Sequence, residues 1–192
     1  VIGIFLMQSC ADKKPETVKK NVQYVSGADE VTCLKLGKEI VDSVGASLKQ
    51  NLLGAMEKGG PQNAISFCNQ NAVALTSSYS LKYNTEVKRV SDKNRNPSNA
   101  ANETELAVLA DFNRMLEKGE PLSPKISIDA EGRKHFYAPI FTGGLCLSCH
   151  GNSKSIQPEV LTVIDSLYPA DLARDYSIEE LRGLWSIKFK NS

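Results

Sequence analysis

The five residues Cys146-Leu147-Ser148-Cys149-His150 form a C-x-x-C-H motif in the C-terminal third of the chain. Two thiols at this spacing can add to the two vinyl groups of a porphyrin, and the adjacent imidazole then lies beneath the iron as its proximal ligand. The motif therefore predicts one covalently bound haem c. Cys146 and Cys149 are the predicted attachment points, and His150 is the predicted first axial ligand.

Two other uses of paired cysteines fit the sequence less well. A zinc site needs a second pair of ligands at metal spacing, and neither Cys33, Cys68 nor His135 supplies one. A thioredoxin-type dithiol lies at a strand-to-helix junction, whereas the residues after the motif, 151–153, read Gly-Asn-Ser and predict a loop. Haem attachment remains the favoured prediction.

The composition predicts one globular domain. Of the 192 residues, 41% are hydrophobic and 23% are charged, which is enough apolar material for a core. The net charge is only +1, and the sequence has no basic stripe interleaved with aromatic residues. Nucleic acid is therefore not an expected partner.

The N-terminal residues predict export and lipidation. Residues 1–7 form an apolar run too short to span a bilayer, so residues 1–9 are expected to be the remnant of a signal peptide that begins upstream. Cys10 follows the small residue Ser9, as in a bacterial lipoprotein processing site, although Met7 stands where Leu is usual. We expect a lipid on Cys10 and a protein that this lipid anchors to a membrane, the outer membrane, so that it faces the periplasm.

Downstream of Cys10 the chain divides into a tether and a folded domain. Residues 10–27 begin with a charged, polar stretch without apolar periodicity, which is typical of a flexible linker. From residue 30 to 58 apolar residues recur at three- and four-residue steps, predicting a long helix that Gly59-Gly60 ends. Pro61 then opens a second helix with Cys68 on its apolar face. Residues 28–192 are the predicted haem domain.

The rest of the domain predicts strands and shorter helices. Asn102 and Glu105 form a capping-box pattern at the start of one helix, and Pro158 opens another. Strands are expected over 85–91, 125–129, 133–140 and 184–189, the middle two joined as a hairpin. The predicted fold class is α+β, with an antiparallel sheet flanked by helices and a long N-terminal helical hairpin.

The second axial ligand of the haem has to come from outside the motif. Met56 and Met115 resemble fillers on helix faces, and His135 lies in a hairpin strand. Cys68 is a further candidate, although an isolated cysteine on an apolar helix face is ordinarily a small buried hydrophobe. The residue pattern alone leaves these candidates open.

Several short motifs occur in a recognisable order along most of the chain. They are Gly59-Gly60-Pro61 with Ala64-Ile65 and Cys68, Arg95-Asn96-Pro97 with Asn99-Ala100, Tyr137 with Pro139-Ile140, the C-x-x-C-H motif with Gly151, Tyr168-Pro169, Arg182-Gly183 and Trp185-Ser186. In this order the chain resembles a family of single-haem c-type proteins with a PAS-like fold, known from cyanobacteria and from bacterial sensor proteins. The resemblance implies a PAS-like sheet, with Cys68 as the second axial ligand. Val73 departs from the family, in which a Pro often follows that Cys.

Together these features predict a redox sensor or electron carrier that is not an enzyme. Its potential is expected to be low, because a thiolate opposite His150 favours the ferric state. Its partner would be an unidentified redox or signalling protein. The alternative is a haem enzyme or a protein that binds peroxide, NO or CO at an open or switchable distal site. His135 has no orienting partner visible in the sequence. Arg95 and Arg182 are expected to be ordinary surface or capping residues, although each can pair with a haem propionate.

Overall fold

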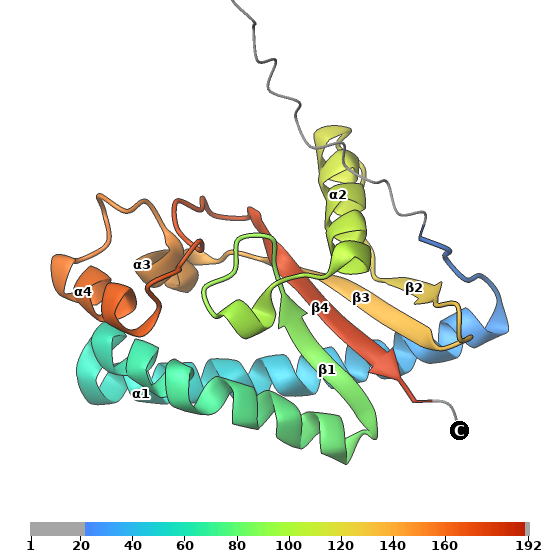
Figure 1. Ribbon diagram of the computed structural model, residues 1–192, viewed down its shortest axis with the longest axis horizontal. Helices are drawn as coiled ribbons and strands as arrows, with labels where there is room; N and C mark the ends of the chain where they lie inside the picture. Colours follow the sequence, from blue (N-terminus) through green and yellow to red (C-terminus); the bar gives the residue numbers. More distant parts are fainter. Residues whose placement is uncertain (1–21, 191–192) are drawn as a thin grey trace, which may run out of the picture.

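The computed structural model describes residues 22–190, so Cys10 and most of the predicted tether lie outside the described residues. The described elements are α1 (Ala28–Lys82), β1 (Thr85–Val90), η1 (Pro97–Asn99), α2 (Glu103–Glu117), β2 (Lys125–Ile128), β3 (Lys134–Phe141), η2 (Gly144–Cys146), α3 (Leu147–His150), α4 (Pro158–Leu167) and β4 (Leu181–Phe189). The four strands form one antiparallel sheet in the order β1-β4-β3-β2 (Figure 1). The predicted α+β class is confirmed.

Element α1 is a helical hairpin with two arms, as Figure 1 shows. The helix breaks at Gly59, whose backbone is extended, and at Gly60, which has a φ of 67°. A left-handed φ favours glycine because a Cβ would be strained there, and Pro61 is compatible with the first turn of the following arm. The predicted stop at Gly59-Gly60 and restart at Pro61 are therefore confirmed.

The sheet has helices on both faces. The first arm of α1 packs Ile40 and Val44 against Val87, Phe136 and Ile187 of the sheet. On the opposite face α2 lies over a second cluster, which consists of Val90, Val108, Leu109, Phe112, Tyr137 and Leu184 (Figure 1). Alternate residues of each strand enter the two cores, as the period of two in a strand requires.

Short local signals define the start of α2 and the turn of the β2–β3 hairpin. Asn102 and Glu105 form the predicted capping box at the start of α2. The β2–β3 hairpin turns at residues 129–133, where Gly132 has a φ of 76°. Residues 22–27 belong to the predicted tether, yet Val25 N–H donates to Ile126 O at 2.9 Å, so this part runs beside β2. Within residues 22–190 no helix is both long enough and apolar enough to cross a membrane.

Two glycines of α1 give a matched prediction about packing. A Cβ on Gly37 would lie 2.2 Å from a ring carbon of Phe136, whereas a Cβ on Gly54 would meet nothing within 4 Å. We expect Gly37→Ala to lower the free energy of unfolding by about 1 to 3 kcal/mol, because the ring has no free space. Gly54→Ala should raise it by about 0.5 to 1 kcal/mol through helix propensity. Urea denaturation of both variants measures the difference, and equal effects would contradict this packing.

Candidate functional site

The C-x-x-C-H motif spans Cys146, the last residue of η2, and the short helix α3, and the segment between α4 and β4 holds it in place. Asp175 N–H donates to Gly151 O at 2.9 Å, and Tyr176 N–H donates to His150 O at 3.0 Å. A Cβ on Gly151 would lie 2.6 Å from Leu147 O. A glycine at this position therefore allows the backbone after His150 to pass close to the carbonyl of Leu147. The motif is thus fixed from its C-terminal side by backbone contacts.

His150 is half-buried and is held in one tautomer. Its Nδ1 lies 2.8 Å from Ala173 O, and because a carbonyl only accepts, Nδ1 carries the hydrogen. Burial and, after it, the cations Arg95 and Arg182 lower the pKa of His150 to about 3, so the ring is neutral at physiological pH. The lone pair of Nε2 is therefore available to a metal, which is the state that an axial ligand needs.

The second arm of α1 brings Cys68 to the motif. Ile65, one turn earlier, packs in a cluster with α4 and Cys149, and the turn that joins the two arms of α1 lies beside α4 in Figure 1. Burial raises the pKa of the Cys68 thiol, and the nearby cations Arg89 and Arg95 oppose this rise. Burial likewise raises the pKa of the Cys149 thiol, Arg95 opposes this rise, and Cys68 adds to it. Cys33, Cys68, Cys146 and Cys149 are all free thiols.

Two further arginines surround this site. Arg89 lies on the same face of β1 as Thr85 and Val87. It therefore faces α1, and it interacts electrostatically with Cys68. Arg182 donates from Nη1 to Ser91 Oγ at 2.8 Å and lies over the ring of Tyr176. Burial lowers the pKa of both guanidinium groups, and Arg182 lowers that of Arg89 further. Among residues 22–190, neither forms an ion pair with a carboxylate.

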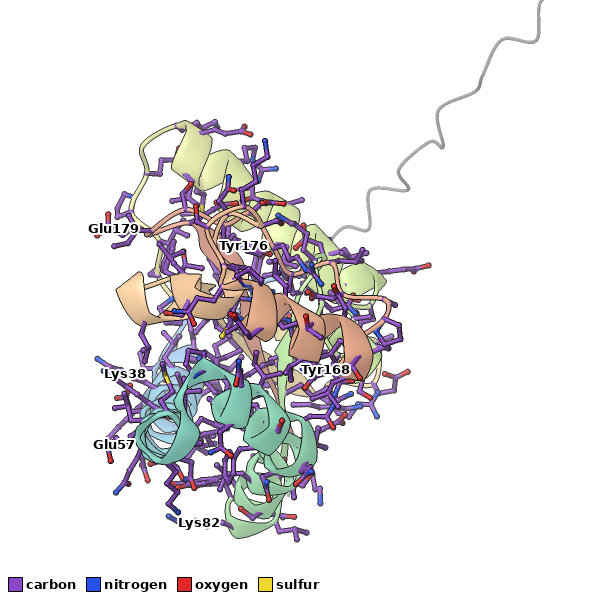
Figure 2. The ribbon with its side chains drawn as sticks, turned by 90° about the vertical axis from the view of Figure 1, so that its left-hand side faces the viewer. Lys38, Glu57, Lys82, Tyr168, Tyr176 and Glu179 are labelled. Atoms are coloured by element: carbon purple, nitrogen blue, oxygen red, sulfur yellow. The ribbon has the colours of Figure 1, made fainter. Side chains whose placement is uncertain are left out.

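These features fit a haem. Buried charges in proteins are ordinarily paired, so two arginines that form no ion pair with a carboxylate among residues 22–190 would suit a ligand with negative charges. A haem carries two propionates, and its iron needs two axial ligands from the chain. Within the described residues no group of three or more His, Cys, Asp and Glu side chains could hold a bare metal ion. In Figure 2 Tyr168 and Tyr176, which flank this region, lie on the segments above the α1 hairpin.

The other histidine lies elsewhere. His135 is near the start of β3, and six residues of extended strand, about 20 Å, separate it from Phe141 at the end that leads to the motif. Its Nε2 is 3.0 Å from Asp129 Oδ2, and its ring stacks on Tyr137. It lines a polar groove of about 600 Å³ with Lys88, Ser127 and other residues, beside α2. The structure therefore does not bring His135 to the motif.

Sequence reasoning missed part of this site. Arg89 has a signal in the sequence, because it is a charged residue at an inward position of an otherwise apolar alternation in β1. Arg95 was expected to be an ordinary surface or capping residue. Instead its side chain is 11% exposed, and its Nε lies 3.0 Å from Asp171 Oδ1. The partners of Arg95 could not be found from local pattern, because they lie far along the chain.

Comparisons with known proteins agree with this architecture. The fold and motif define a single-sheet α+β protein in which the C-x-x-C-H motif and the second arm of a helical hairpin contribute to one hydrophobic cluster. The model of the Tll0287-like family matches residues 11–190, so the chain belongs to this family. The crystal structure of the cyanobacterial heme-protein Tll0287 aligns with a TM-score of 0.61 and 22% identity, covering 82% of this chain and 96% of that one. A comparison with curated proteins finds no match.

Proposed function

We propose that the protein is a haem c protein of low potential that carries electrons or senses redox state. The observation that carries the proposal is the convergence of Cys68, the C-x-x-C-H motif and two arginines that form no ion pair with a carboxylate among residues 22–190. Cys146 and Cys149 would attach the haem, and His150 and Cys68 would be its axial ligands. The structurally similar cyanobacterial protein is described as a heme-protein, which supports haem as the cofactor. We also propose that the sheet is PAS-like.

The chain's own residues account for the expected chemistry. A haem held at this site would take up and release one electron. His150 offers a neutral imidazole whose Nδ1–H is fixed by Ala173 O. Arg89 and Arg95 stabilise negative charge on Cys68, and an anionic sulfur ligand opposes the addition of an electron. A potential well below that of a protein with His and Met ligands follows.

The rival proposal, a haem enzyme, gains no support from the two histidines of the chain. Peroxide chemistry requires a side chain that moves a proton near the reacting oxygen. His150 is assigned to the metal, and His135 is bonded to Asp129 at the far end of β3. We therefore favour electron transfer or sensing with an unidentified protein partner over catalysis.

The proposal is tested by expressing the full chain, preceded by an export signal, in a host that matures c-type cytochromes. Haem should remain on the polypeptide in a denaturing gel, and a redox titration should give a potential below that of His/Met cytochromes. Absence of covalent haem would contradict the proposal. Rapid CO binding by the reduced protein, or sustained peroxide turnover, would favour the gas-binding or enzymatic alternative instead.

Arg89 should contribute to haem affinity, because its guanidinium would face a propionate. Hydrogen bonds to charged groups contribute about 1.5 to 3 kcal/mol, so Arg89→Gln should weaken noncovalent haem binding roughly 10- to 100-fold. The measurement is a haem titration of a protein in which Cys146 and Cys149 are both serine. Lys88→Gln is the matched control, because Lys88 precedes Arg89 in β1 but points to the opposite face. Equal effects of the two substitutions would contradict this role.

The anchor at Cys10 is proposed from the sequence alone. Cys10→Ser should move the exported protein from the membrane fraction to the soluble periplasmic fraction, because the lipid is attached through that sulfur. Fractionation followed by immunoblotting measures the change. Cys33→Ser is the control and should leave the protein in the membrane fraction. A Cys10→Ser protein that stays with the membrane would exclude lipidation as the anchor.

A further inference from the structure

One arginine in the loop after β1 contacts both the residue before His150 and the carbonyl to which His150 donates a hydrogen bond. Arg95 donates from Nη2 to Cys149 O at 2.6 Å and to Ala173 O at 3.1 Å. The same side chain donates from Nε to Asp171 Oδ1 at 3.0 Å and from Nη2 to Asp171 Oδ2 at 3.2 Å. The Asp171 side chain is 1% exposed, so this is an enclosed ion pair. Asp171 Oδ1 also accepts from Ala173 N–H at 2.9 Å.

The carbonyl of Ala173 therefore has two donors. It accepts from His150 Nδ1 at 2.8 Å and from the Arg95 guanidinium at 3.1 Å. A cation on one lone pair draws electron density from the oxygen, which makes the carbonyl a weaker acceptor for the second donor. A weaker Nδ1–H bond leaves the imidazole less anionic and its Nε2 a weaker donor to a metal.

We infer that Arg95 is a positioning residue that sets the donor strength of His150 by sharing the Ala173 carbonyl. This inference rests on the proposed function, since it requires His150 to be a haem ligand. Arg95 holds Ala173 where it orients the imidazole, and its charge limits how strongly that carbonyl pulls on the Nδ1 proton. Removing the guanidinium should strengthen the His150 bond, favour the ferric state and lower the potential.

Arg174 offers a matched control for the charge. Its Nε donates to Asp171 Oδ2 at 2.8 Å, so it binds the same carboxylate as Arg95. Its side-chain hydrogen bonds go to Asp171 and Asp165, and none reaches Ala173 O among the described residues. Arg174→Gln therefore removes a cation from the same network and leaves the shared carbonyl with both of its donors.

The test is a redox titration of the holoprotein and of Arg95→Gln, Arg95→Lys and Arg174→Gln. We expect Arg95→Gln to lower the equilibrium constant for electron uptake about tenfold, which is about 59 mV for one electron. Arg174→Gln should change it less than about twofold, by the same conversion. Arg95→Lys keeps the charge but not the forked geometry, so it should shift the potential in the same direction by less. If Arg95→Gln yields no holoprotein, the sign of the Arg95→Lys shift decides.

A second measurement follows the hydrogen bond directly. In reduced protein labelled with ¹⁵N-histidine, the Nδ1–H proton of His150 should move downfield in Arg95→Gln, and His135→Gln assigns the two rings. An unchanged potential, or equal shifts in Arg95→Gln and Arg174→Gln, would overturn the inference while covalent haem in the wild type still upheld the proposed function. Wild type without haem, or without His ligation, would overturn both.

Discussion

Replacing both Cys146 and Cys149 with serine should abolish covalent haem completely, because each thioether of a c-type haem needs one of these sulfurs. The haem-stained band on a denaturing gel should disappear, and the mass of the denatured polypeptide should equal that of the bare chain. The expectation depends on both thiols being free and on two short consecutive helical elements, η2 and α3, that present them together with His150.

Cys33→Ser is the control for this loss. Cys33 packs against the core between the first arm of α1 and the sheet, in a cluster that includes no residue of α3. Its substitution should leave one haem per chain. A band that persists in the double variant would contradict the assignment of the motif, and a band lost in Cys33→Ser as well would indicate a general failure of folding.

Cys68→Ala should produce the second large effect, a change in the second axial ligand with the haem still attached. The ferric absorption spectrum should change, and the potential should rise by more than about 100 mV, within the roughly 0.8 V that axial ligands span. The rise follows because Cys68 is expected to bind as an anion, which Arg89 and Arg95 stabilise. The reduced variant should also bind CO faster than the wild type, because one coordination position is free.

Cys33→Ala is the matched control for Cys68→Ala, since both cysteines are half-buried and both lie on α1. It should leave the ferric spectrum and the potential unchanged. A Cys68→Ala protein with the wild-type spectrum would contradict thiolate ligation. The candidate would then be another side chain, and Met56 and Met115 would return as alternatives.

Local sequence signals were sufficient for most of the fold. Gly59-Gly60-Pro61 predicted the hairpin in α1 because only a few residues tolerate the backbone at Gly60, and Asn102 with Glu105 predicted the start of α2 through side chains three residues apart. These features depend on contacts within one or two turns. The sheet order β1-β4-β3-β2 does not depend on such local contacts, because it pairs the last strand of the chain with the first.

The candidate site was only partly predictable for the same reason. The C-x-x-C-H motif is local, and the resemblance to a known family pointed to Cys68. The contacts of Arg95 with Cys149 O, Asp171 and Ala173 O join residues 54 to 78 positions apart in the chain. Such contacts leave no periodic pattern in the sequence, so the second layer of interactions around His150 became visible only in three dimensions.

The most direct test of the central claim is X-ray absorption at the iron edge of the oxidised holoprotein and its Cys68→Ala variant. Imidazole and thiolate ligation predict one sulfur atom in the first coordination shell of the wild type, because the two thioether sulfurs of Cys146 and Cys149 bind the porphyrin and not the iron. That sulfur should be absent from the variant. A wild type without a sulfur ligand, or a variant that keeps one, would contradict ligation by Cys68.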